Sequence, residues 1–447
     1  MIDTGDTAWV LTASALVLLM TPGLAFFYSG LVPSKSAANT IMQSFAMMMV
    51  VSVVWVLWGY SLAFGNDVGG FVGDLQNFGL RGVGMDPGPD GGTIPPLVFM
   101  AFQMMFAIIT PALITGALVQ RVKFSSLLVF TVLWVTFVYA PLAHWVWGGG
   151  WIATELGALD YAGGTVVHIN AGAAAVAAAL VIGRRRGVTR NIVHDVPKVV
   201  LGTGLLWFGW FGFNAGSALA ADGFAANAFV QTNTAAAMGA ITWMGLTWWK
   251  SGKPSIVGAC IGAVAGLVAI TPAAGFVGTW PDLDHYGNIF PALIIGAGAS
   301  LFGFYTIRLL HRVKELDDTL DVFAVHGVGG LWGAFATGLF AVAAYTGGAN
   351  GLVEGSFDLL WRQLGAMGAA LGWSFVISGL IMLGIKHFMA VRVEEDEELA
   401  GLDRSEHDEP AYQFDEPGFY SGGVSTMVSG TPDATPEPTS VTAAGEE

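Results

Sequence analysis

Charged residues and cysteines are scarce in this 447-residue chain. Only 11% of its residues are charged, whereas a soluble globular domain has about 25%, so a soluble enzyme is nearly excluded. The single cysteine, Cys260, rules out intramolecular disulfides and thiolate-held zinc or iron–sulfur sites. Its apolar surroundings predict an inert buried thiol. Acidic residues are also missing from the middle of every long apolar run.

Long apolar runs dominate the sequence instead. Hydrophobic residues make up 54% of the chain, and the mean hydropathy is +0.62. A membrane helix needs about 20 mostly apolar residues. The sequence therefore predicts an all-α polytopic membrane protein with eleven transmembrane helices, at residues 8–30, 40–64, 96–119, 125–147, 163–183, 197–220, 226–249, 256–273, 288–309, 323–346 and 361–389.

The net charge of −15 is unevenly distributed. Residues 1–390 hold 18 acidic and 16 basic residues, whereas residues 391–447 hold 15 acidic and 2 basic residues. This division predicts a transmembrane domain at 1–390, a short cytoplasmic tail at 391–412 and a disordered, acidic, low-complexity extension at 413–447. The acidic balance argues against nucleic acid as a partner.

The loop charges predict the orientation. If the N-terminus lies outside and the helices alternate, 14 of the 16 basic residues of the body fall on the cytoplasmic side, and only Arg81 and Arg362 fall outside. Cytoplasmic loops carry an excess of Lys and Arg. We therefore expect an extracellular N-terminus and a cytoplasmic C-terminal tail.

Two histidines stand out within the predicted helices. An odd helix count favours a five-plus-five inverted repeat with one final helix, and the fifth and tenth runs carry His168 and His326 shortly after their starts. Ionisable residues inside membrane helices are costly and often mark a pathway. Two separate, hydrogen-bonded core histidines are the alternative interpretation. A metal site is disfavoured because no neighbouring Cys, Asp or Glu supplies further ligands, so we expect no metal and no cofactor.

Aromatic residues form a second pattern. Phe102 and Phe106 share one face of the third run, Phe213 and Ser217 share one face of the sixth, and Trp147 ends the fourth. Such aromatics usually pack or anchor the helix at the lipid headgroups. The functional alternative is a cation–π cage with a hydroxyl acceptor, which suits a small cation.

Asp160 opens the fifth run. An acidic residue there can cap the exposed N–H groups of a helix and complement its dipole, with direct contact to a substrate as the alternative. The sequence Asp-Tyr-Ala-Gly-Gly at 160–164, running into His168, resembles the Asp-aromatic-Ala-Gly-Gly motif of the ammonium transporters, the Amt/Mep/Rh superfamily. Four further segments, at 102–106, 143–150, 210–218 and 321–330, are similar to that family. The resemblance spans residues 1 to about 412, and the presence of both Trp147 and Ser217 resembles the Amt branch.

The resemblance implies residue roles and partners. It implies a homotrimer in the cell (plasma) membrane, with one pore per subunit, that takes up ammonium for nitrogen supply and accepts methylammonium as an analogue. It implies an outer NH4+ recruitment site, which maps to Phe106, Trp147 and Ser217. It implies a gate of two rings, which map to Phe106 and Phe213, with Phe102 beside them. It also implies a pair of pore histidines, which map to His168 and His326. A PII-type nitrogen regulatory protein at the cytoplasmic face is a further implied partner.

The physical chemistry agrees with that picture. Moving a bare unit charge into a medium of ε ≈ 4 costs on the order of 20 kcal/mol, whereas aromatic faces and one hydroxyl return about 2–4 kcal/mol. The favoured hypothesis is recruitment of NH4+, loss of its proton near the gate and passage of NH3 along the imidazoles; the histidines could also relay the proton, by the same path or by a separate one. The alternatives are an ammonium sensor that signals through its tail and a channel for water or another neutral solute. A membrane enzyme is disfavoured because no nucleophile–base arrangement is apparent.

Overall fold

The computed structural model describes residues 1–87, 92–186, 193–278 and 289–412. Residues Met1–Ala411 form one compact unit. The predicted acidic extension at 413–447 lies outside the described residues, so its disorder stays a prediction.

The first half of the chain is helical, with one small hairpin. Its elements, in chain order, are α1 (Thr4–Leu31), η1 (Ser34–Ser36), α2 (Ala37–Val54), η2 (Trp55–Gly59), α3 (Tyr60–Phe64), β1 (Asp67–Val68), β2 (Val72–Gly73), η3 (Phe78–Leu80), α4 (Pro96–Leu118), α5 (Phe124–Trp134), η4 (Val135–Tyr139), α6 (Ala140–Trp147), η5 (Ile152–Leu156), η6 (Gly164–Ile169) and α7 (Asn170–Ile182). The strands β1 and β2 pair antiparallel, with Asp67 opposite Gly73. The hairpin was not predicted; Gly69 and Gly70 make its turn with φ of 67° and 76°.

The second half is helical in its described part. Its elements are α8 (Val196–Ala215), η7 (Gly216–Ala218), α9 (Gly223–Ser251), α10 (Ile256–Ile270), α11 (Phe290–Leu310), η8 (Phe323–Gly327), α12 (Val328–Phe340), α13 (Ala343–Thr346), η9 (Leu352–Glu354), α14 (Asp358–Phe388), α15 (Glu395–Ala400) and α16 (Leu402–His407). Among these, η7 and η9 are short 3-10 turns, and η8 is a π-helical turn.

Each of the eleven predicted runs coincides with a helical segment. Nine helical segments of the described residues are long and apolar enough to cross a membrane. The run predicted at 226–249 corresponds to α9, which is not among these nine. The run predicted at 256–273 corresponds to α10, which has 15 residues and is therefore not among them either. The all-helical membrane fold is therefore confirmed, and the count of eleven crossings stays a prediction.

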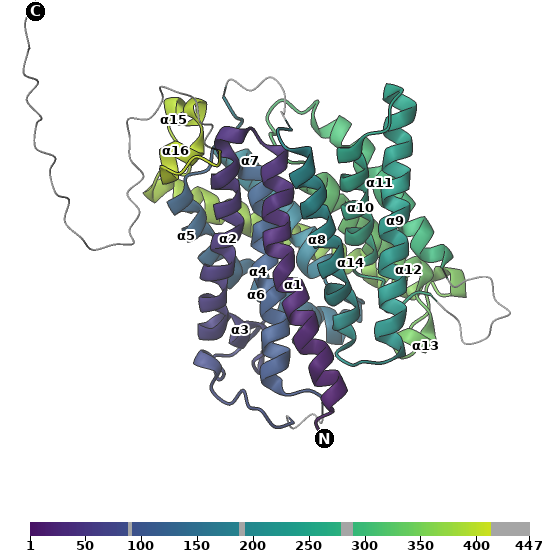
Figure 1. Ribbon diagram of the computed structural model, residues 1–447. Helices are drawn as coiled ribbons and strands as arrows, with labels where there is room; N and C mark the ends of the chain where they lie inside the picture. The colour runs from purple at the N-terminus through teal and green to yellow at the C-terminus, as the bar shows by residue number, and fades with distance from the viewer. Residues whose placement is uncertain (88–91, 187–192, 279–288, 413–447) are drawn as a thin grey trace, which may run out of the picture. The chain divides into compact units, whose positions relative to one another are not determined.

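Small residues allow the helices to pack closely. The helices α1 and α8 lie side by side (Figure 1). A Cβ added to Gly202 of α8 would lie 2.3 Å from the backbone nitrogen of Phe27 in α1, and one added to Gly212 would lie 2.8 Å from the carbonyl oxygen of Ala13. Glycine lets two backbones approach in this way, as small residues do in membrane helix pairs.

The tail segment packs against the bundle. Figure 1 shows α15 and α16 at the end of the bundle opposite the N-terminus. The Asp403 carboxylate accepts hydrogen bonds from the backbone nitrogens of Ala38 (3.1 Å) and Asn39 (2.8 Å) at the start of α2. The carboxylate thus caps a helix that is far away in the sequence.

Candidate functional site

Two π-helical turns carry the candidate pore histidines. His168 lies in η6 and His326 lies in η8. The Asp160 carboxylate caps η6 by accepting from the backbone nitrogens of residues 163–166 at 2.9, 2.7, 2.7 and 3.1 Å. The Asp318 carboxylate caps η8 by accepting from the nitrogens of residues 322 and 323 at 2.9 and 2.7 Å. Each aspartate precedes its histidine by eight positions.

The structure brings the two histidines together. Their Nδ1 atoms are 3.3 Å apart, and the imidazole centroids are 5.4 Å apart at an interplanar angle of 27°. Both side chains are buried. Gly172 and Gly327 permit this approach, because a Cβ on Gly172 would lie 2.4 Å from the Cα of Gly327. At such a nitrogen–nitrogen contact one ring donates and the other accepts, so the pair shares one hydrogen.

Three phenylalanines close the space on one side of the histidines. The Phe106 and Phe213 centroids are 4.4 Å apart, and the rings are tilted at 49° rather than stacked in parallel. Phe102 meets Phe106 edge-on at 4.9 Å. The Phe213 ring is nearly parallel to that of His168, with centroids 6.0 Å apart. All three phenylalanine side chains are 1% exposed, so the rings fill the space next to His168.

A cavity of about 310 Å³ lies beyond the phenylalanines. We call it the outer cavity; it is lined by Phe99, Phe102, Gln103, Phe106, Val146, Trp147, Tyr161, Ser217 and Leu219. The three predicted recruitment residues are all in this lining. The Ser217 hydroxyl donates to the Phe213 carbonyl oxygen (2.8 Å), which leaves its lone pairs as acceptors. The lining of the outer cavity contains no acidic side chain.

Asp160 does not line the outer cavity but positions a residue that does. The Trp147 indole donates to the Asp160 carbonyl oxygen at 2.9 Å. The same residue therefore caps the turn that carries His168 and orients an aromatic wall of the cavity.

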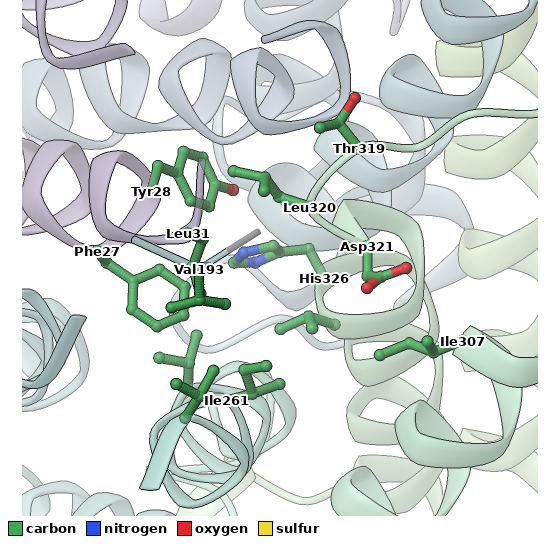
Figure 2. A pocket seen from close by; sticks show the side chains of 13 residues that line it. Phe27, Tyr28, Leu31, Val193, Ile261, Ile307, Thr319, Leu320, Asp321 and His326 are labelled. Carbon is green, nitrogen blue, oxygen red and sulfur yellow. The ribbon is translucent and has the colours of Figure 1, made fainter. Parts of the chain in front are cut away.

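Two more cavities lie next to the histidines. A central cavity of about 10 Å³ touches Phe213, His168 and His326, and about that volume accommodates one water-sized molecule. An inner cavity of about 170 Å³ begins at His326 and is lined further by Tyr28, Thr319 and Asp321. Figure 2 shows the His326 ring extending from its helix into this group of side chains.

Sequence reasoning missed the inner cavity. Asp321 pairs there with His311, with Nε2 and Oδ1 2.9 Å apart. This hydrogen bond raises the pKa of His311. Tyr28 sits on the first apolar run and gave no signal that set it apart. In the described part of the chain, no three His, Cys, Asp or Glu side chains gather in a way that could hold a metal ion.

A bundle of long apolar helices that encloses several cavities is the architecture of a multi-pass membrane protein. The model of the Ammonium Transporter Family matches residues 8–412. The ammonium transporter of Bacillus subtilis is 48% identical over 412 residues, covering 92% of this chain and 98% of the relative. Ammonium transporter Amt1 of Archaeoglobus fulgidus is 46% identical, with 91% and 99% covered.

Solved structures show the same likeness. The crystal structure of Candida albicans Mep2 superposes with a TM-score of 0.80 at 38% identity, covering 89% of this chain and 88% of that one. A structure named Sensor Amt Protein gives a TM-score of 0.81 at 30% identity, covering 90% and 98%. The chain belongs to the ammonium transporter family, and it is accordingly a transporter and not an enzyme.

Proposed function

We propose that this transporter recruits NH4+ in the outer cavity, removes its proton near the phenylalanine gate and conducts NH3 past His168 and His326. The observation that carries the proposal is the sequence of cavities, in which an aromatic chamber is followed, beyond the phenylalanine gate, by a single-molecule space lined by two imidazoles. The family membership supports ammonium as the substrate.

The cavity linings favour NH3 over the intact ion at the centre. The polar side chains that line the central cavity are His168, His326 and Trp210. The Trp210 indole donates to Thr271 (2.9 Å) and is not available to a passing molecule. No carboxylate there offsets a desolvation cost on the order of 20 kcal/mol for a bare charge. Neutral ammonia has no such charge, and the imidazoles can exchange hydrogen bonds with it.

Flux in proteoliposomes tests this function. Purified protein should take up methylammonium and ammonium and should conduct K+ poorly, because K+ has no proton to lose. His168→Asp should change the flux or the selectivity, whereas His387→Asp, at an exposed site at the end of α14, serves as the matched control. Equal K+ and ammonium conductance, or unchanged transport in His168→Asp, would contradict the mechanism.

The membrane arrangement belongs to the same proposal. We infer eleven crossings in a five-plus-five repeat with a final helix, N-terminus outside, in the plasma membrane. The paired Asp160–His168 and Asp318–His326 turns support the repeat. We infer a homotrimer from the family to which the chain belongs. A PII-type protein would bind at the end that carries α15 and α16. Native mass spectrometry of the detergent-solubilised protein, alone and with a PII-type protein, tests both assemblies.

A sensor role is a second candidate, favoured by the similarity to Sensor Amt Protein. Truncation after residue 390 should keep flux if the tail only signals. Because that change also removes the Asp403 cap of α2, truncation after Tyr412 is the matched control. Water permeability of the same liposomes tests the neutral-solute alternative, which predicts fast water flux without ammonium selectivity.

A further inference from the structure

Arg121 is a fully buried cation outside the passage. It lies in the turn between α4 and α5, with 0% of its surface exposed. Its Nε donates to the Gly183 carbonyl oxygen (2.7 Å), Nη1 donates to the Thr319 hydroxyl (2.7 Å) and Nη2 donates to the Asp317 carbonyl oxygen (2.6 Å). Burying a charge is expensive unless such bonds satisfy it, so the three acceptors must stay in place around it.

The acceptors lie just after the helix that carries His168 and just before the helix that carries His326. Gly183 directly follows α7, which continues the η6 turn that holds His168. Asp317 and Thr319 flank Asp318, the residue that caps the η8 turn holding His326. The guanidinium therefore ties the end of one histidine-bearing helix to the start of the other.

A separate contact joins the residue before Asp160 to the middle of α12. The Gln363 side chain of α14 accepts from the Leu159 nitrogen (2.7 Å) and donates to the Leu159 carbonyl oxygen (2.8 Å), next to Asp160. The same amide nitrogen donates to the Ala334 carbonyl oxygen of α12 (3.2 Å). Loss of the Arg121 side chain would thus free only one end of the pair, while the other stays held.

The surroundings keep Arg121 charged and fixed. Burial lowers its pKa to about 10, while the carboxylate of Asp317 acts in the opposite direction, so the guanidinium is protonated at neutral pH. Asp317 is itself held by a two-point bond from Arg185, at 2.9 and 2.8 Å. The tail also holds the backbone of Arg121, because the Val393 nitrogen donates a hydrogen bond to the Arg121 carbonyl oxygen (3.1 Å).

We propose that Arg121 is a positioning residue for conduction, whose three-way hydrogen bonding sets the spacing between His168 and His326. The inference rests on the proposed role of the histidine pair. Only a planar fork of several donors can reach three separate acceptors at once; a lysine presents its donors from a single atom, and a methionine presents none.

The test uses the full chain in proteoliposomes with three variants. Arg121→Met should lower the maximal rate per folded protein by about tenfold or more, as small misplacements in reactive sites do, and Arg121→Lys should recover part of it. The half-saturating ammonium concentration should stay near that of the wild type, because the recruitment residues line the outer cavity and Arg121 does not. Arg186→Met is the matched control, since that guanidinium reaches the exposed Glu395 carboxylate (3.1 Å).

Solid-state NMR of 15N-histidine-labelled protein reads the spacing directly. The Nδ1–Nδ1 correlation of the histidine pair should appear in the wild type and in Arg186→Met and should vanish in Arg121→Met. If Arg121→Met does not fold, Thr319→Val removes one acceptor and should shift rate and correlation in the same direction by less.

Specific results would overturn the proposal. An unchanged rate and an unchanged correlation in the Arg121 or Thr319 variants would do so. A half-saturating concentration that rises as the rate falls would also do so, because it would indicate a general loss of structure. A wild type that fails to conduct ammonium would instead refute the proposed function, and the NMR correlation would still decide the role of Arg121.

Discussion

Asp160→Asn isolates the contribution of one buried helix cap. Asparagine keeps a single side-chain oxygen, so two of the four backbone N–H groups that point at the carboxylate lose their acceptor and face an NH2 group instead. Hydrogen bonds to charged groups contribute about 1.5–3 kcal/mol each. The variant should therefore lose about 3–6 kcal/mol of unfolding free energy. The change should also disturb Trp147, whose indole bonds the same residue.

Reversible unfolding in mixed detergent micelles, followed by tryptophan fluorescence, measures this loss. Asp222→Asn is the matched control. Asp222 also caps a helix, but it is exposed and accepts the Phe224 and Ala225 nitrogens through one oxygen (2.9 and 3.0 Å), so it should lose no more than about 1 kcal/mol. Equal losses in both variants would refute the reasoning, as would an Asp160→Asn protein as stable as the wild type.

Three further predictions concern affinity, packing and pH. Ser217→Ala should raise the half-saturating ammonium concentration about tenfold or more, which corresponds to the loss of one hydrogen bond to a charged group, about 1.5 kcal/mol, and uptake at graded concentrations should show little change in maximal rate. Gly202→Ala should cost about 1–3 kcal/mol because its Cβ would meet the α1 backbone, whereas Gly204→Ala enters open space and should be tolerated in the same unfolding assay. Burial, and then the charge of Asp321, raises the pKa of Asp318 from 3.8 to about 7. Its contribution to stability is therefore present below pH 3.8 and declines as the pH rises toward 7, and Asp318→Asn should flatten the stability profile across that window.

Apolar run length was enough to predict the helices, because the bilayer dictates it. The local periodicity of apolar residues does not predict where π-helical turns or the hairpin interrupt the α-helices. The π-helical turn η6 depends on a carboxylate that draws four N–H groups to one point, and the hairpin at 67–73 depends on the helix against which it packs, where the Trp151 nitrogen donates to the Gly70 carbonyl oxygen (3.0 Å). Both are tertiary effects.

The residues of the predicted site do lie together, but those that hold them were harder to find. Asp318 could have been recognised, since its spacing to His326 repeats that of Asp160 to His168. Arg121 could not, because a basic residue in a short loop normally indicates only which side of the membrane the loop occupies. Its burial depends on two segments that are 62 and 196 residues away in the sequence.

The smallness of the central cavity has an electrical consequence. Moving one elementary charge across a membrane potential of about 100 mV changes its energy by about 2.3 kcal/mol. In the proposed mechanism, a space for one small molecule between uncharged walls leaves no room for a file of ions. The voltage across the membrane then acts on at most one relayed proton for each ammonia molecule that passes.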